Sequence, residues 1–329
     1  AAAEARRHLT PRHIAMETRH WLVLSDADVA WTREQSGRLE RTHAEFRRVM
    51  RRLGIEPEPL RHKLVCVLFE QRDAYRVFAR RADAVVAEWV AGYYSPAADR
   101  TVFYRADANP SVVAARARLA ELEGDLANIE ARLLDARRRG DVAHARRLEA
   151  QRDAWHEHLG GEARRINAFT DEVGVATVVH EATHQLLFHT GVQSPMAPPP
   201  IWISEGMATS FETDDTTAAF GPDHEHPIRR DRFRELLADG STLIPLRQLV
   251  AWDRVPADDP AVIDALYHQS YALTMWLFRT RRPQLRTFML EIRDAPPRTD
   301  ADRVAAFERA FGPVERLEML WLRWERRSG

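Results

Sequence analysis

The chain has 329 residues, enough for about two domains or for one domain enlarged by insertions. With 45% apolar and 29% charged residues it has the composition of a folded globular protein, which excludes intrinsic disorder as the main state. Its 48 basic and 49 acidic residues give a net charge of -1, which excludes the strongly basic surface typical of proteins that bind nucleic acid or anionic membranes.

Two further features narrow the class of protein. Cys66 is the single cysteine, which excludes an intrachain disulfide and a cysteine-based metal cluster, and its apolar neighbours indicate a buried position on a strand. No apolar run approaches the roughly 18 residues needed to cross a membrane. We therefore expect no nucleic-acid partner and no membrane span, and the sequence indicates no compartment.

The first 110 residues alternate strand and helix patterns. These patterns predict strands over 20–24, 64–69, 88–94 and 101–104, and helices over 28–53 and 72–82. The strand over 64–69 is apolar on both faces, which is typical of a central strand. The last two strands flank a turn-rich segment and are expected to form a hairpin. Residues 1–110 are therefore predicted to be a small mixed α/β unit.

A different pattern follows over 112–159. Apolar residues recur at alternating spacings of three and four with charged residues between them, as at Leu119, Leu122, Leu126, Ile129 and Leu133. Gly140-Asp141 interrupts this pattern, which predicts an inserted antiparallel helical hairpin with Gly160-Gly161 as a hinge at its end. The hairpin could pack on itself, on the body of the protein or across a dimer. We assign it residues 111–160.

The remaining residues, 161–329, read mostly as helices. The predicted helices cover 164–190, 204–214, 229–238, 261–280, 283–294, 300–311 and 313–327. The arginines at 229–230 are expected at a solvated helix end. Together with the N-terminal unit, this predicts an α+β fold that is predominantly helical, with a helical C-terminal part that carries the chemistry described next.

The most informative motif is His180-Glu181-Ala182-Thr183-His184. Two histidines at i and i+4 lie about one turn apart on the same face of a helix, so both imidazoles can reach one metal ion. Glu181 lies beside that face, where it can bond a metal-held water without being a ligand. Taken alone, the motif leaves open an exposed helix with incidental histidines.

Zinc bound by two histidines needs a third protein ligand and an open position for water. Glu205 follows His184 by 21 residues, and Ser204 is expected to cap a helix with Glu205 in its first turn. Gly206 would allow this helix to pack closely against a neighbour. The segment Trp202-Ile203-Ser204-Glu205-Gly206-Met207-Ala208 resembles the gluzincin metallopeptidases, the superfamily of thermolysin and the membrane alanyl aminopeptidases.

The gluzincins pair His-Glu-x-x-His with a glutamate about twenty residues later, often in a Trp-x-x-Glu-Gly-x-Ala context, and both features occur here. The resemblance implies one Zn2+ per chain held by His180, His184 and Glu205, with Glu181 as general base. It also implies a peptide or protein substrate and a cleft between the α/β unit and the C-terminal helices. A still closer resemblance is to bacterial peptidase-MA-like families of unknown function, over residues 17–110 and 162–327.

A third segment, beginning at Tyr267, is similar to the Tyr-x-Lys-Gly segment of the aminopeptidase branch, with Gln269 and Ser270 in place of Lys and Gly. The match implies that Tyr267 stabilises the oxyanion, and Tyr271 is the alternative donor, although a core position is expected for it. A Gly-x-Met-Glu-Asn exopeptidase segment is absent, so endopeptidase action is favoured.

The surroundings of the zinc ligands are less well defined by the sequence. Thermolysin-like enzymes have an Asp at the position of Thr209, for which a plain helix residue is expected here. Glu212 could orient a zinc ligand, but a solvated surface glutamate is favoured. The strand over 101–104 could bind an extended substrate by edge pairing or serve only as a structural hairpin.

Two alternatives to an active peptidase stay open. The first is a non-catalytic peptidase-like scaffold in which the helical hairpin binds a partner protein or a second copy of the chain. The second is a latent enzyme whose cleft is covered by the hairpin or by the proline-rich stretch 195–200. An intact Glu181 argues against the scaffold, because a structural zinc site needs no general base.

Overall fold

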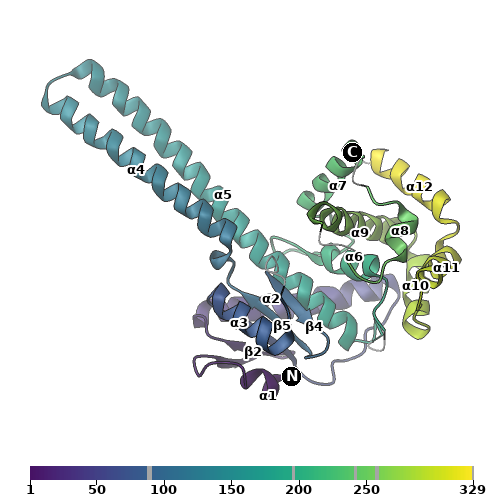
Figure 1. Cartoon of the computed structure of the whole chain (residues 1–329). Helices are drawn as coiled ribbons and strands as arrows, with labels where there is room; N and C mark the ends of the chain where they lie inside the picture. Colours follow the sequence, from purple (N-terminus) through teal and green to yellow (C-terminus); the bar gives the residue numbers. More distant parts are fainter. Residues whose placement is uncertain (87–90, 195–196, 241–242, 256–258, 328–329) are drawn as a thin grey trace.

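A mixed five-stranded sheet forms the N-terminal part of the protein in a computed structural model, which describes all residues except 87–90, 195–196, 241–242, 256–258 and 328–329 (Figure 1). The strands are β1 (Ile14–Glu17), β2 (Trp21–Ser25), β3 (Leu64–Phe69), β4 (Gly92–Ser95) and β5 (Arg100–Tyr104). Their order is β1-β2-β3-β5-β4, with β3 parallel to both of its neighbours and the two outer pairs antiparallel. The central position predicted for the strand over 64–69 is confirmed.

Helices cover both faces of this sheet. They are α1 (Ala2–Arg6), α2 (Val29–Leu53), α3 (Arg72–Asp83) and the long α5 (Val142–His189). Side chains alternate along β3, so that Leu64, Cys66 and Leu68 join the large core with α2 and α5. The intervening apolar side chains of β3 pack with α3 on the opposite face. This two-sided burial is what the continuous apolar run of β3 predicts.

The strand that forms the sheet edge differs from the sequence prediction. β5, which includes residues 101–104, lies between β3 and β4, so its backbone hydrogen bonds are used within the sheet. The edge is β4. The predicted strand over 88–94 falls partly on 87–90, which lie outside the described residues. Three short elements were not predicted from the sequence: α1, β1 and the 3-10 helix η1 (Ala106–Ala108).

The predicted helical hairpin is present and projects away from the body (Figure 1). It consists of α4 (Pro110–Arg138) and the first part of α5. Its buried seam includes Ile129, Leu133 and Leu148. The expected hinge at Gly160-Gly161 is wrong, because α5 continues through both glycines as one helix of 48 residues, about 70 Å long. Packing against α4 before the glycines and against the sheet after them outweighs the weak helix preference of glycine.

The predicted boundary between residues 160 and 161 therefore lies inside a single helix. Its first half builds the hairpin, and its second half packs on α2, β4 and β5. The described helices are all too short or too polar to cross a lipid bilayer.

Seven helices form the C-terminal part: α6 (Ile201–Phe211), α7 (Pro227–Asp239), α8 (Leu246–Ala251), α9 (Pro260–Thr280), α10 (Arg282–Asp294), α11 (Asp300–Phe311) and α12 (Val314–Arg327). The short α8 was not predicted. α6 begins three residues earlier than expected, directly after Pro200, because the apolar residues Ile201, Trp202 and Ile203 are buried as its first turn. The protein is thus α+β and mainly helical, as predicted.

The contact between α6 and α9 depends on Gly206. A Cβ atom at this position would lie 2.5 Å from the Ser270 carbonyl oxygen and closer still to the Thr274 hydroxyl. The close packing predicted for Gly206 is therefore present, and it sets the distance between the helix that carries Glu205 and the helix that carries Tyr267.

We expect Gly206→Ala to lower the free energy of unfolding by at least about 1–3 kcal/mol, because the added methyl group forces two packed helices apart. Gly37→Ala is the matched control, since Gly37 lies in α2 with open space around its Cα. There we expect a gain of about 0.5–1 kcal/mol from helix propensity. Urea unfolding followed by circular dichroism measures the free energy of unfolding of both variants. Equal stability of Gly206→Ala and the wild type would contradict the close contact of α6 with α9 at Gly206.

Candidate metal centre

Three potential ligand atoms from α5 and α6 converge on one point. The Nε2 atoms of His180 and His184, one helical turn apart on α5, are 3.1 Å from each other. Glu205 Oε2, on α6, lies 3.2 Å from His180 Nε2 and 3.5 Å from His184 Nε2. The structure therefore brings together the three residues that the sequence predicts as metal ligands.

The size of this triangle fits a zinc ion. Zinc binds nitrogen and oxygen ligands at about 2.0–2.1 Å, and a tetrahedral angle then separates neighbouring ligand atoms by about 3.3 Å. Glu205 Oε2 is also buried and accepts no hydrogen bond among the described residues. A buried carboxylate oxygen needs a proton or a cation beside it, and the groups nearest to this one are the two imidazole Nε2 atoms.

The charges around the two imidazoles also favour a dication. The carboxylates of Glu181, Glu205 and Glu212 all raise the pKa of His180. The basic side chain of Arg229 forms an ion pair with Glu212. With neutral imidazoles, three carboxylates and one guanidinium leave two negative charges uncompensated. Burial alone would lower the pKa of His180, but Glu205 and Glu212 outweigh it and raise the pKa to about 10. The site thus attracts positive charge, as a proton or as a metal ion.

Glu212 fixes the orientation of His180. The His180 Nδ1–H group donates to Glu212 Oε1 at 2.9 Å, which leaves the Nε2 lone pair pointing toward Glu205. Arg229 donates to both oxygens of Glu212, from Nε at 2.7 Å and from Nη2 at 2.8 Å. Although burial acts in the opposite direction, Arg229 and His180 lower the pKa of Glu212, so this carboxylate stays charged.

Two sequence expectations about these surroundings are wrong. Glu212 is not a solvated surface glutamate but is 6% exposed, because α6 ends one residue earlier and turns its carboxylate toward α5. Arg229 is not at a solvated helix end, since it pairs with Glu212 from the first turn of α7. The hydroxyl of Thr209 bonds the Glu205 carbonyl oxygen at 2.7 Å within α6, which agrees with the expected plain helix role.

Ser204 takes a different role from the predicted helix cap. It lies inside α6, and its hydroxyl oxygen is 3.3 Å from His184 Nδ1. Glu205 is consequently in the second turn of α6, not the first. No local pattern predicts the Ser204–His184 contact, because it depends on how α6 packs across α5.

Glu181 is held by the edge strand of the sheet. Its Oε2 atom accepts a hydrogen bond from the backbone N–H of Tyr94 in β4 at 2.8 Å. Tyr94 pairs with Thr101 of β5, and this N–H points away from β5, toward α5. Burial raises the pKa of Glu181, and the charges of His180 and His184 oppose that shift. The predicted general base therefore lies beside the candidate ligands with one oxygen oriented by the backbone.

Tyr267 approaches the centre from α9. Its ring centroid is 6.2 Å from that of His180, and the negative charge of Glu205, together with burial and Glu181, raises its pKa well above the usual value. Its hydroxyl is therefore protonated at neutral pH and can donate. The alternative donor, Tyr271, is fully buried and its hydroxyl accepts from the His226 N–H at 2.9 Å, which matches the expected core position.

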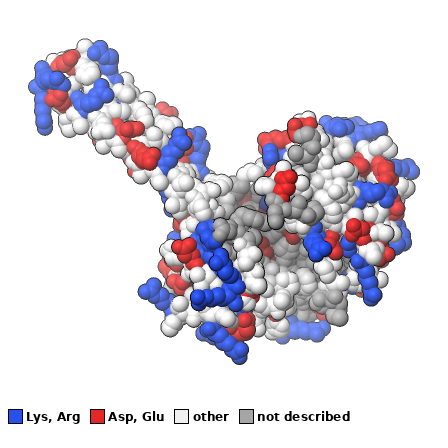
Figure 2. Space-filling view, in the orientation of Figure 1, with Lys and Arg blue, Asp and Glu red and all other residues white. Residues whose placement is uncertain are grey.

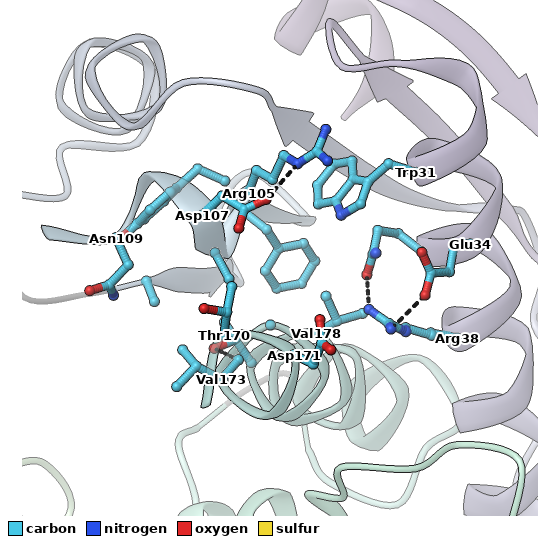
Figure 3. Close-up of a pocket in the computed structure, with 17 residues that line it drawn as sticks. Trp31, Glu34, Arg38, Arg105, Asp107, Asn109, Thr170, Asp171, Val173 and Val178 are labelled. Carbon is cyan, nitrogen blue, oxygen red and sulfur yellow. Dashed lines mark hydrogen bonds and ion pairs between the residues drawn. The ribbon is translucent and has the colours of Figure 1, made fainter. Parts of the chain in front are cut away.

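A separate cavity of about 200 Å³ lies between α2, β5, η1 and α5 (Figure 3). Its lining includes Val178 of α5 but none of the three candidate ligands. Four of the charged side chains that line it are paired, Arg38 with Glu34 and Arg105 with Asp107. This cavity belongs to the base of the hairpin and not to the metal centre.

Comparison with known proteins assigns no activity to this centre. Residues 174–299 match the model of a family described as a protein of unknown function, DUF1570. The match spans all three candidate ligands, Glu181 and Tyr267, but neither the sheet nor the hairpin. No curated protein matches the chain. The resemblance to an uncharacterised family is thus supported over this region.

The contact between Glu212 and His180 leads to a prediction. Glu212→Gln should weaken zinc binding about 10- to 100-fold, because the neutral amide loses the charge and one of the two acceptor oxygens that hold His180 and Arg229. Competition with a chromophoric chelator at pH 7 measures the affinity, and circular dichroism checks the fold. Ser204→Ala is the matched control at the other histidine, where the longer 3.3 Å contact predicts a smaller loss. An unchanged affinity in Glu212→Gln would contradict the orienting role.

Proposed function

We propose that the protein is a zinc-dependent metallopeptidase of the gluzincin type that hydrolyses peptide bonds by means of a metal-activated water. The observation that carries the proposal is the triangle of ligand atoms from His180, His184 and Glu205, with edges of 3.1 to 3.5 Å, beside the carboxylate of Glu181. A structural zinc site is normally closed by four protein ligands, whereas three ligands leave a position for water. One zinc ion is expected at this centre.

A zinc ion bound by these three residues would lower the pKa of a water molecule toward about 7. Glu181 is placed to accept a proton beside His180, since Tyr94 N–H holds its Oε2 atom and fixes the carboxylate. The same carboxylate can then return the proton to the leaving amine. Tyr267, with its proton retained, donates to the negative charge that develops on the substrate carbonyl oxygen.

The sheet edge offers a place for an extended substrate. β4 is the outer strand next to β5, and through Tyr94 it contacts the carboxylate that acts as base. A peptide added along β4 would lie close to the metal centre, since α5 packs directly against this strand. An extended peptide that passes the centre in both directions suits endopeptidase action, which the sequence also favours.

The hairpin supports a second candidate function, that of a scaffold for a partner protein. It projects from the body and carries exposed apolar side chains near its tip, with Leu134 54% and Val142 64% exposed. Figure 2 shows basic and acidic side chains along this arm, with basic ones gathered at the tip. In a scaffold that uses the hairpin alone, the metal centre would have no catalytic role.

Glu181→Gln separates the two functions. We expect it to keep the zinc ion at this centre and to lose about 10²- to 10⁴-fold in the rate of peptide hydrolysis, because the amide cannot accept a proton. The rate is measured with a mixture of internally quenched peptides, and zinc by mass spectrometry. Glu157→Gln, an exposed glutamate on the same helix, is the control and should match the wild type. A zinc-loaded wild type and Glu181→Gln with equal rates would support the scaffold instead.

Tyr267→Phe tests the oxyanion donor. We expect kcat to fall about 10²- to 10³-fold with little change in KM, because the hydroxyl interacts with charge that develops only during reaction. Tyr271→Phe provides the control, since its hydroxyl bonds the His226 backbone and its removal should cost about 1 kcal/mol of stability without lowering kcat. A smaller loss of kcat in Tyr267→Phe than in Tyr271→Phe would make Tyr271, and not Tyr267, the oxyanion donor.

A further inference from the structure

We infer that His62, Asp99 and His189 form a second binding site for a divalent transition metal of the zinc class, separate from the centre at His180. Each of these residues offers a ligand atom, and the three atoms lie within 4.8 Å of one another. His189 Nε2 is 2.5 Å from Asp99 Oδ1, and the His62 and His189 rings are 5.2 Å apart. Neither the proposed hydrolysis nor the family match assigns a role to these residues.

The three ligands come from three segments that the fold holds together. His189 is the last residue of α5, Asp99 lies in the turn between β4 and β5, and His62 precedes β3. The His62 segment is fixed on both sides, by the bond from Glu58 N–H to the Thr190 carbonyl and by the bond from Leu64 N–H to the His20 carbonyl. The site is therefore largely formed before any ion binds.

The backbone conformation of Asp99 also fits the role of a metal ligand. Its φ angle is +52°, in the left-handed region that non-glycine residues seldom adopt. This conformation turns the carboxylate toward the end of α5.

The donor set selects the class of ion. Two imidazoles and one carboxylate suit zinc and similar divalent metals, whereas calcium and magnesium prefer more oxygen ligands. His62 Nδ1 lies 3.2 Å from the Lys63 carbonyl oxygen, a contact in which this nitrogen donates and Nε2 keeps its lone pair. Side-chain exposures of 20% for His189 and 32% for Asp99 leave room for a water as a further ligand.

Binding at this second site should be weaker than at the first. His189 Nε2 and Asp99 Oδ1 are 2.5 Å apart in a direct hydrogen-bond contact, which an ion must replace while it widens the gap to about 3.3 Å. At the first centre the atoms are already 3.1 to 3.5 Å apart. The two sites are thus expected to fill in separate steps as the zinc concentration rises.

An ion at the second site would clamp the β4–β5 turn to the end of α5. The same β4 strand donates the Tyr94 N–H to Glu181, which is also on α5. Metal bound at His62, Asp99 and His189 would therefore fix the edge strand against the helix that carries the first centre. This clamp is a property of the fold and holds whether or not the first centre hydrolyses peptides.

The test is a titration of the metal-free full chain with Zn2+ at pH 7.5, in competition with a chromophoric chelator. We expect two ions per wild-type chain, a tighter and a weaker one. His62→Ala and Asp99→Asn should each weaken the second step about tenfold or more and keep the first. Asparagine tolerates the left-handed backbone at position 99, and His62 is exposed, so both variants should fold. His158→Ala, an exposed histidine on the hairpin, is the control and should bind two ions.

His184→Ala separates this inference from the proposed function, because it should lose the tighter ion and keep the weaker one. A wild type that binds one ion, removed by His184→Ala and unaffected by Asp99→Asn, overturns the second site and leaves the first. One ion that is lost in Asp99→Asn but kept in His184→Ala supports the second site and counts against the first. Two ions retained in both His62→Ala and Asp99→Asn overturn the inference.

Discussion

The rotation of α5 on the sheet determines where the chemistry of this protein lies. One face of α5 is apolar and buried against β3, β5 and α2 through residues such as Val175, Val179 and Leu186. Gln185 fixes this orientation, because it is fully buried and bonds both the Trp21 indole N–H and the Val65 carbonyl oxygen. A buried polar side chain with two specified partners tolerates little rotation of the helix. His180 and His184 are therefore directed toward α6 as a consequence of sheet packing.

The second constraint is electrostatic. Glu181, Glu205 and Glu212 are brought close to the same two histidines, and burying carboxylates together is unfavourable unless positive charge is nearby. Arg229 supplies part of that charge through Glu212. Glu205 Oε2 has no hydrogen-bond donor among the described residues. An arrangement of this kind lowers stability unless a proton or a cation is bound between the groups, as is typical of binding sites.

Local sequence patterns predicted the parts of the site that depend on one helix. The i, i+4 spacing of His180 and His184 is a property of helix geometry, and the apolar run of β3 requires a central strand. Glu205 was found through the resemblance of its own segment to the gluzincin metallopeptidases. Each of these predictions needs only a few consecutive residues and no knowledge of how distant elements pack.

The parts that could not be predicted depend on contacts between distant segments. Glu212 and Arg229 look like surface charges in the sequence, and only the packing of α6 against α5 and of α7 against α9 brings them together as a pair. The edge position of β4 follows from the strand order, which no local pattern specifies. Gly160-Gly161 resembles a hinge, yet the helix continues because both flanks are packed.

The course of α5 also bears on how the hairpin could affect the metal centre. A latent enzyme covered by the hairpin would need α4 to lie over α6 and α9, which carry Glu205 and Tyr267. Instead α4 packs along α5 and η1, and the arm points away from those helices (Figure 1). Since α5 is continuous, the hairpin and the histidines belong to one rigid element. A partner bound at the tip would therefore act on the centre through the position of α5, and not by covering it.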